Sequence, residues 1–393
     1  MAPKLIFPKT TRRRFLTTAG AGAGAIILRG GLRPAHAQST SGTVRMMGGP
    51  TLALNDWSLF EKETGLKMEF TPFHTDNVGA LYNEFTANGA GDRFDIVQVL
   101  GGVQKGLAGK GYVDALDTGK LKNYSGISEG IKTSPLLTTP DGKTQCIPIY
   151  MNADAFGYFP AKLKKPRPPE MVNWDLLLND EETKGQCAID GDFLTLFYGG
   201  MYLKTRKLAD INDPANMTDK ECRTATDWLI ERKKAGQFRT FWSNYDEQVA
   251  NFVSGEALVQ RCWEPAVKDV QKKGLDVVYA TCSDFHVKWV QASFVPKQSK
   301  ERDNWNEVYK TLDWFLGGSY SAELAALRGY CTSRPDLGIE YAKAQNWKPE
   351  QVKLLTDNLE KIKIKFANPN FWITGLPDTM EFHESQMERL KNA

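Results

Sequence analysis

Apolar and polar positions between residue 43 and about residue 152 follow two alternating patterns. Strand-like runs are predicted at 43–47, 66–70 and 94–99. Helical spacing is predicted at 78–87 and at 52–64, where Gly65 ends the helix. Strands that alternate with helices are typical of a doubly wound α/β lobe, so we expect such a lobe in this region.

A second block of mixed strand and helix patterns begins near Asp154. Its strands are predicted at 186–189, 257–263 and 275–281, and its helices at 193–203 and 224–235. The run 289–296 has the pattern of a strand that crosses between regions, and the later helices are predicted at 305–316, 321–327 and 349–362. Neither an internal repeat nor a low-complexity linker separates the two blocks. We therefore expect two lobes between which the chain crosses more than once, with a cleft between them.

The composition is that of an ordinary globular protein, because the 393 residues are 41% hydrophobic and 25% charged. The formal charge of +3 depends on residues 1–37, which hold seven basic residues and no acidic one. The remaining residues include 43 basic and 47 acidic ones, a net charge of −4. A mildly acidic body without a block of Lys and Arg argues against nucleic acid as the main partner, since phosphate binding needs clustered cations.

Residues 1–37 have the pattern of an export signal. Arg12-Arg13-Arg14 precede a weakly apolar stretch from Phe15 to Leu28, and Ala35-His36-Ala37 is a small-x-small cleavage site. The paired arginines resemble a twin-arginine signal. The apolar stretch is shorter than the about 20 residues that span a bilayer. We therefore expect export by the Tat translocase, cleavage after Ala37 and a periplasmic protein.

Neither a metal site nor a catalytic motif stands out in the remaining sequence. Its six cysteines form no CxxC pair, its three histidines form no HxxxH pair, and no strand–GxGxxG–helix unit is present. We expect no metal, no cofactor and no enzymatic activity, with a cofactor-bearing redox enzyme as a remote alternative. The cysteines are either free and buried or partly paired, with Cys146–Cys331 as the candidate disulfide. They are Cys146, Cys187, Cys222, Cys262, Cys282 and Cys331.

Several short segments carry a resemblance to a known family. In order along the chain they include Phe60-Glu61-Lys62-Glu63-Thr64-Gly65, Asp95-Ile96-Val97, Trp174-Asp175-Leu176, Gly255-Glu256-Ala257 and Gly329-Tyr330. Their order and spacing resemble periplasmic solute-binding proteins of ABC importers, in the branch that includes spermidine/putrescine-binding proteins. The resemblance implies an α/β fold of two lobes, the type 2 periplasmic-binding-protein fold. It also implies a small-molecule solute held between the lobes and an ABC importer permease in the inner membrane as partner.

The resemblance also implies how the chain divides. Lobe 1 is expected to comprise residues 38–152 and a returning segment, 291–333. Lobe 2 is expected at 153–290, with a helical part, 334–393, packing largely on it. The hinge strands are expected to cross near 150–153, 288–291 and 332–335.

Carried over position by position, the resemblance implies a set of ligand-binding residues. Polyamine-binding relatives hold a flexible chain against aromatic rings, with carboxylates at the ammonium ends, through cation–π attraction and charge-assisted hydrogen bonds. Trp263 and Trp289 fall on cleft tryptophans, and Tyr330 falls on a cleft tyrosine. Asp192 falls on an acid that binds ammonium, and Ser243 falls on a cleft hydroxyl.

Other positions depart from that pattern. Gln291 and Thr195 stand where the family has acids, and Gln291 remains among the expected ligand-binding residues. Gly48-Gly49 and Gly101-Gly102 fall near positions that carry aromatic rings in the family. Candidates to fill these gaps are Asp154, Trp242 and Glu264.

The glycine pairs allow two interpretations. They are either tight turns that need a positive φ or places where bare N–H groups bind an anion. By resemblance, a polyamine or related organic amine is the leading ligand. The alternative is an anionic or zwitterionic solute that carries a carboxylate, phosphonate or sulfonate.

Overall fold

The computed structural model describes residues 42–73, 78–132, 134, 136–139, 142–165, 172–367, 371–372 and 377–393. The predicted signal, residues 1–37 with its cleavage site after Ala37, lies outside the described residues. No helix in the described ranges is both long enough and apolar enough to cross a membrane.

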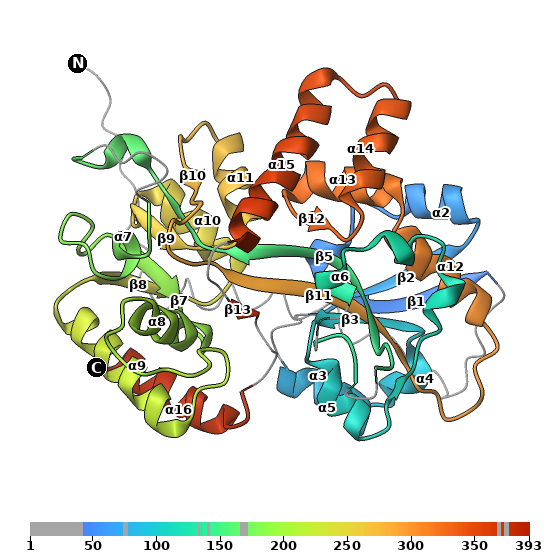
Figure 1. Ribbon diagram of the computed structural model, residues 1–393, viewed down its shortest axis with the longest axis horizontal. Helices are drawn as coiled ribbons and strands as arrows, with labels where there is room; N and C mark the ends of the chain where they lie inside the picture. Colours follow the sequence, from blue (N-terminus) through green and yellow to red (C-terminus); the bar gives the residue numbers. More distant parts are fainter. Residues whose placement is uncertain are drawn as a thin grey trace, which may run out of the picture. The chain divides into compact units, whose positions relative to one another are not determined.

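The first lobe is built on a sheet of eight described strands in the order β12-β5-β11-β3-β1-β2, with β4 and β13 also pairing with β11 (Figure 1). β1 is parallel to β2 and β3, whereas β11 is antiparallel to β3 and β5. The strands are β1 (Thr43–Gly48), β2 (Lys67–Pro72), β3 (Ile96–Leu100), β4 (Val113–Asp114), β5 (Cys146–Asp154), β11 (Val287–Pro296), β12 (Cys331–Thr332) and β13 (Phe371–Trp372). The predicted α/β lobe is confirmed, and its parallel strands lie close to the predicted runs.

Short helices connect these strands. They are α2 (Ser58–Thr64), α3 (Val78–Thr86), α4 (Ala90–Arg93), α5 (Gln104–Gly109), α6 (Glu129–Lys132) and α12 (Trp305–Phe315). Gly65 ends α2 in the left-handed conformation, with φ at 68°, as predicted. The helix predicted at 52–64 is wrong in its first half, because Asp56 accepts the Ser58 N–H at 2.8 Å and starts the helix there.

The second lobe is built on a five-stranded sheet in the order β10-β6-β9-β7-β8. Its strands are β6 (Phe156–Tyr158), β7 (Cys187–Asp190), β8 (Phe238–Trp242), β9 (Val259–Arg261) and β10 (Val278–Tyr279). Its helices are α7 (Asp175–Leu178), α8 (Leu194–Thr205), α9 (Asp219–Lys234), α10 (Tyr245–Ser254), α11 (Glu264–Lys272) and α16 (Met380–Asn392).

Two predicted elements of this lobe have different bounds in the structure. Helix α9 begins earlier than the predicted residue 224, because Thr218 and Glu221 form a reciprocal capping box. β9 is shorter than the predicted 257–263, because Pro265 stands in the first turn of α11 and the helix begins directly after Trp263.

The chain passes between the two sheets through long paired strands. It leaves the first sheet between Asp154 and Phe156 and returns to it between Tyr279 and Val287. β5 and β11 lie side by side in antiparallel register (Figure 1). The predicted boundaries at 152/153 and 290/291 therefore fall inside strands of the first sheet.

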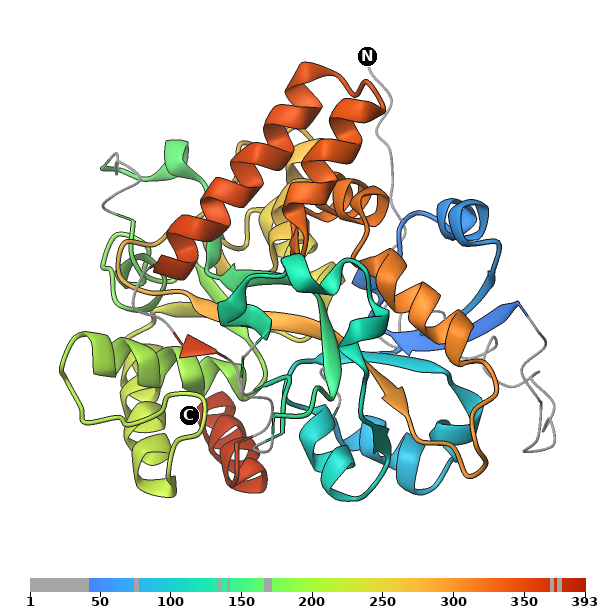
Figure 2. The same ribbon diagram turned by 45° about the vertical axis from the view of Figure 1, so that its right-hand side comes forward.

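The C-terminal segment 334–393, expected to pack largely on the second lobe, contacts elements of both lobes. Helix α16 lies against α8 and α9 of the second lobe (Figures 1 and 2). In contrast, α14 (Pro335–Ala344) and α15 (Pro349–Ala367) pack with α13 (Gly318–Arg328). The cause is the distribution of apolar residues, because Leu355 joins a cluster of alanines on α13 and α14, while Ile362 belongs to the core of the first sheet.

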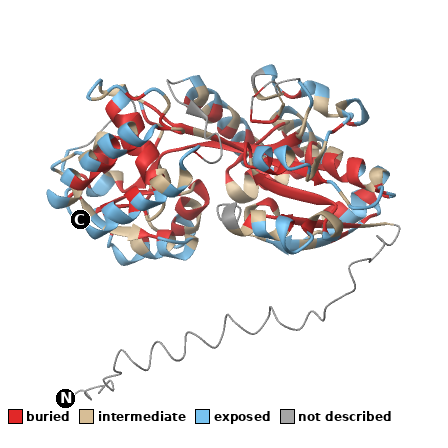
Figure 3. Cartoon of the chain, turned by 90° about the horizontal axis from the view of Figure 1, so that it is seen from below, coloured by how far each residue is buried: buried red, intermediate tan, exposed pale blue. Residues whose placement is uncertain are grey.

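Buried residues follow the strands and the inner faces of the helices (Figure 3). All six cysteines are buried, and no disulfide joins any two of them. The candidate disulfide between Cys146 and Cys331 is wrong, because β12 pairs with β5 so that Cys331 lies opposite Met151, five residues along the strand from Cys146. Burial raises the pKa of both thiols.

Candidate ligand-binding site

A cavity of about 260 Å³ is lined by residues of both lobes. The first lobe contributes the turn after β1, the end of β3, strands β5 and β11, and the segment from α13 to β12. The second lobe contributes β9 and the N-terminal ends of α8, α10 and α11. The cavity is therefore placed where movement of one lobe against the other would change its walls.

Five aromatic rings form much of the lining. Tyr150 and Tyr330 are stacked, with ring centroids 5.2 Å apart and planes 12° apart, and Trp289 stands edge-on to both. Trp263 is stacked with Tyr245 at 6.2 Å. The structure thus brings together three aromatic residues predicted from the sequence, Trp263, Trp289 and Tyr330, and adds two that the sequence analysis missed. One feature of the sequence pointed to Tyr150, because it is the first residue of the hinge strand expected to cross near 150–153.

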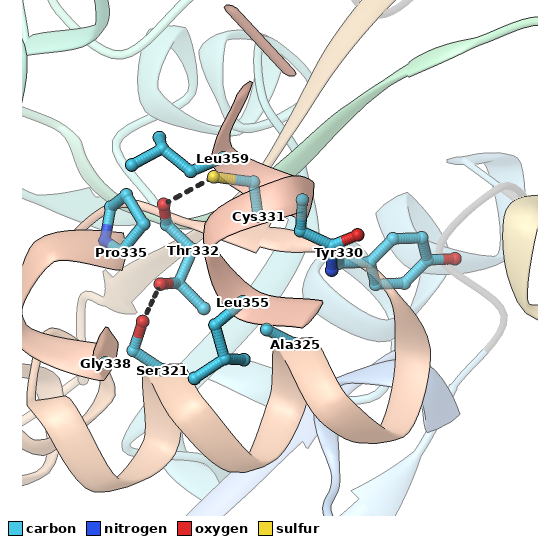
Figure 4. Close-up of a pocket in the computed structure, with 10 residues that line it drawn as sticks. Ser321, Ala325, Tyr330, Cys331, Thr332, Pro335, Gly338, Leu355 and Leu359 are labelled. Atoms are coloured by element: carbon cyan, nitrogen blue, oxygen red, sulfur yellow. Dashed lines mark hydrogen bonds between the residues drawn. The ribbon is translucent and has the colours of Figure 1, made fainter. Parts of the chain in front are cut away.

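The ring of Tyr330 belongs to this cavity and not to a smaller one behind it. A second cavity of about 10 Å³ is lined by α13, β12 and α15. Figure 4 shows that the Tyr330 ring points away from Ser321, Thr332 and Leu355, which line that small space. The ring is therefore available to the larger cavity.

Asp154, Asp190 and Arg261 form a buried group, which we call the pocket cluster. The Arg261 guanidinium is 1% exposed, forms an ion pair with Asp154, and lies 3.1 Å from Asp190 Oδ1. Trp289 Nε1 donates a hydrogen bond of 2.6 Å to Asp154 Oδ1. Burial raises the pKa of both carboxyls although Arg261 opposes the shift. One guanidinium faces two carboxylates, so the cluster is rich in acid.

A second charged group on the lining was missed by the sequence analysis. Arg328 is the last residue of α13, and its Nη2 donates to the Ala53 carbonyl at 3.4 Å. Within the described ranges, no carboxylate forms an ion pair with it. The sequence feature that could have indicated Arg328 as a lining residue is its position two residues before Tyr330, which was predicted to bind the solute.

Gln291 lines the cavity, but several other predicted site residues lie outside its lining. Gln291 accepts a hydrogen bond from Gln98. Asp192 is half-buried, and its Oδ1 accepts the Leu194 N–H at 2.9 Å at the start of α8. Ser243 is exposed, and Trp242 is buried with its Nε1 donating to the Arg261 carbonyl at 2.8 Å. Asp192 and Trp242 thus make hydrogen bonds within the protein, outside the cavity lining.

Glu264 also lies outside the lining, in what we call the lysine cluster: Glu264, Lys361 and Lys365. The carboxylate forms an ion pair with Lys361, lies 3.7 Å from Lys365 Nζ, and accepts a 3.0 Å hydrogen bond from Asn152. Burial alone would raise the pKa of Glu264, but the two lysines and Asn152 outweigh it and lower the pKa to about 2. Both oxygens of this acid are already satisfied by the protein.

The N–H groups of the glycine pairs have acceptors within the protein. Gly49 donates to Gln98 Oε1 at 2.7 Å, Gly101 to the Val290 carbonyl at 2.7 Å, and Gly102 to Gln104 Oε1 at 2.9 Å. Gly102 has a φ of 102°, which is a turn conformation that favours glycine. Gly48 and Gly49 approach Gln98 closely, since a Cβ on Gly48 would lie 2.9 Å from Gln98 Oε1. The argument for an anionic solute therefore does not rest on these glycines.

No group of three or more His, Cys, Asp or Glu side chains that could hold a metal ion is found in the part of the chain that the structure describes. The site is an aromatic cavity with one acid-rich cluster and one separate guanidinium.

Residues 58–349 match the family model of the bacterial extracellular solute-binding proteins. The chain belongs to this family. The periplasmic spermidine/putrescine-binding protein 1 of Haemophilus influenzae is 20% identical to this solute-binding protein over 342 residues, which cover 85% of this chain and 84% of the relative.

Solved structures share the fold of this solute-binding protein. The substrate-binding protein of the spermidine/putrescine ABC transporter of Streptococcus pneumoniae, solved with calcium and HEPES, has a TM-score of 0.66 at 15% identity, over 90% of this chain and 99% of that one. The binding protein MotA of A. tumefaciens B6, solved with glucopine, has a TM-score of 0.61 at 11% identity, over 89% and 99% of the two chains. The two-lobe fold expected from the sequence is therefore confirmed.

Proposed function

We propose that this protein captures a small organic solute in the aromatic cavity and delivers it to the permease of an ABC importer in the inner membrane. Export through the Tat translocase and cleavage after Ala37, which leave the protein in the periplasm, belong to the same proposal. The family and the transporter proteins among its structural relatives support it.

The observation that carries the proposal is the lining of the cavity by both lobes. A solute that touches both lobes favours the closed arrangement over the open one, and differential affinity of this kind is what shifts a hinge equilibrium. A permease that binds only the closed form would then distinguish loaded protein from empty protein.

The leading solute is an organic amine, with polyamines as the class that the relatives support. Five aromatic rings line the cavity, and each well-placed ring attracts a cation by about 0.5–2 kcal/mol. The pocket cluster supplies negative charge on the same lining, at Asp154. An ammonium that lies against Trp289 and Asp154 would use both contributions.

A second candidate is an anionic or zwitterionic solute. Gln291 and Thr195 stand where polyamine-binding relatives have acids, and Arg328 adds a positive charge to the lining.

Thermal unfolding with a panel of solutes tests the proposal, after the protein is unfolded and refolded to remove any bound solute. Putrescine and spermidine are compared with small carboxylates, phosphonates, sulfonates and amino acids. A solute that binds only the folded state stabilises it by about 4 kcal/mol at a thousandfold excess over its Kd. We expect an amine to raise Tm and Trp289→Ala to weaken its binding by about 1–3 kcal/mol.

The transport role has its own test. Deleting the gene should abolish uptake of the solute that binds, and restoring the gene should recover it. Normal uptake in the deletion strain would contradict delivery to a permease, even where binding is confirmed.

A further inference from the structure

We propose that Arg328 binds a carboxylate of the solute, so that the solute is a zwitterion with an amine and a carboxylate and not a simple polyamine. This inference rests on the proposed function, because it names the class of solute that the same cavity takes.

The charged side chains on the cavity lining fall into two groups. Asp154, Arg261 and Arg328 are the charged side chains that line the cavity. Arg261 is held by Asp154 and Asp190, both of which face it at ion-pair distance. Arg328 is not joined to Asp154 by an ion pair and contacts a backbone carbonyl at 3.4 Å. The cavity therefore presents an acid-rich group and a separate cation that has no carboxylate at ion-pair distance among the described residues, although Asp269 attracts it from further away. This charge pattern complements a zwitterion.

Arg328 differs in this respect from the other arginines that are buried or half-buried. Each of the others lies within ion-pair distance of a carboxylate, whereas Arg328 has no such partner in the ranges that the structure describes. Those others are Arg45, Arg206, Arg232, Arg261, Arg302 and Arg334. Among the described residues, Arg328 is thus the half-buried arginine without a carboxylate at ion-pair distance, and Asp269 acts on it only over a longer range. A carboxylate of the solute would supply the missing partner.

The position of Arg328 suits this role. It ends α13, and Gly329 follows it in the left-handed conformation with its N–H bonded to the Ala325 carbonyl, so the backbone at this point is fixed. A guanidinium offers five N–H donors in a planar fork that matches a carboxylate with two parallel hydrogen bonds. Among the described residues, the Ala53 carbonyl accepts from Nη2 of Arg328, and the buried Nε has no hydrogen-bond partner.

A polyamine would meet the same guanidinium with a second ammonium, and like charges at short range repel. The zwitterion avoids this repulsion because its amine lies over the aromatic rings beside Asp154 while its carboxylate faces Arg328. The two ends of one small molecule would then be held by different walls of the cavity.

Titration calorimetry on the whole protein tests the assignment with matched pairs of probes. Putrescine and 4-aminobutanoate have the same four-carbon chain and differ in one terminal group, and the shorter and longer members of the two series extend the comparison. We expect the amino acid of suitable length to bind more tightly than its diamine. Arg328→Gln should weaken its binding by about tenfold or more, because a charge-assisted bidentate contact is lost, and should leave diamine binding unchanged or stronger.

Two further variants serve as a control and as a conservative replacement of Arg328. Arg223→Gln removes an exposed arginine on α9 and should change neither affinity. Arg328→Lys keeps the charge without the planar fork and should give an intermediate affinity for the amino acid, which serves if Arg328→Gln does not fold.

The outcomes separate this inference from the function on which it rests. A wild-type protein that binds diamines but none of the matched amino acids overturns the role of Arg328 and leaves amine capture standing. Equal losses for both series in Arg328→Gln assign a packing role to the residue and also overturn the inference. A wild-type protein that binds neither series contradicts amine capture itself, and the inference fails with it.

Discussion

The pocket cluster and the lysine cluster place carboxylates in equally buried surroundings with opposite results. In the pocket cluster, Asp154 and Asp190 share Arg261, and burial raises the pKa of both acids. In the lysine cluster, Glu264 alone faces Lys361 and Lys365, and its pKa falls to about 2. Burial raises the pKa in both clusters, and only in the lysine cluster do the opposing charges and hydrogen bonds outweigh it.

This difference separates a structural cluster from one that can take part in binding. Glu264 has its positive charge and its hydrogen bonds within the protein, including one from Asn152 on β5. The pocket cluster has one positive charge fewer than it has acids, and Asp154 lines the cavity. A solute ammonium would supply the charge that this cluster lacks, whereas the lysine cluster lies outside the cavity lining.

Removing a counter-charge should therefore be most costly in the pocket cluster. Arg261→Met leaves two buried carboxylates without a positive partner, and breaking a buried pair in this way costs about 3–5 kcal/mol. Lys365→Met leaves Glu264 with Lys361, so we expect a smaller loss of about 1–3 kcal/mol. Urea unfolding at pH 7 gives both free energies of unfolding. Adding Asp190→Asn to Arg261→Met should recover part of the loss, and an equal loss in the two single variants would contradict the comparison.

The periodicity of apolar and polar residues predicted most of the helices and strands. Helix α12 lies within one residue of its predicted bounds, as does the start of β1. Local side-chain chemistry caused the errors in length, as at Asp56 and in the capping box of α9. Resemblance to a family identified Trp263, Trp289 and Tyr330, all of which line the cavity.

The remaining site residues could not be obtained from sequence for geometrical reasons. Glu264 follows Trp263 directly, yet successive residues at a helix start point about 100° apart, and only one of the two lines the cavity. The status of Arg328 depends on which carboxylates come near it in the fold, and those lie far away in the sequence. The sequence shows that residue 328 is an arginine, but whether a carboxylate lies near its guanidinium depends on the tertiary structure.

The two clusters should differ in how pH changes their contributions to the free energy of unfolding. The folded-state pKa of Glu264 is about 2, below its ordinary value of 4.5. Its contribution to stability is therefore full above about pH 4.5 and is lost as pH falls towards 2, on the order of 3 kcal/mol in total. Asp154 and Asp190 have raised pKa values, so their contribution has the opposite sign and stability falls as pH rises through those values.

Urea unfolding at a series of pH values measures this difference. Glu264→Gln should remove part of the loss of stability between pH 4.5 and 2, and Asp190→Asn should make the acid loss steeper by removing an opposing contribution. A Glu264→Gln curve that runs parallel to the wild-type curve in that interval would contradict the low pKa.

The smallest expected effect concerns affinity and compares one matched substitution in each cluster. Asp154→Asn keeps the size of the side chain and an acceptor for Trp289 Nε1 but removes a charge from the lining. We expect it to weaken the best-binding amine of the panel by about tenfold, because a charge-assisted contact becomes a neutral one. Glu264→Gln removes a charge from the lysine cluster, outside the lining, and should leave the affinity within about twofold of wild type. Calorimetry on the folded variants measures both. If Glu264→Gln weakened binding as much as Asp154→Asn, the lysine cluster would act on the solute and the separation between the two clusters would fail.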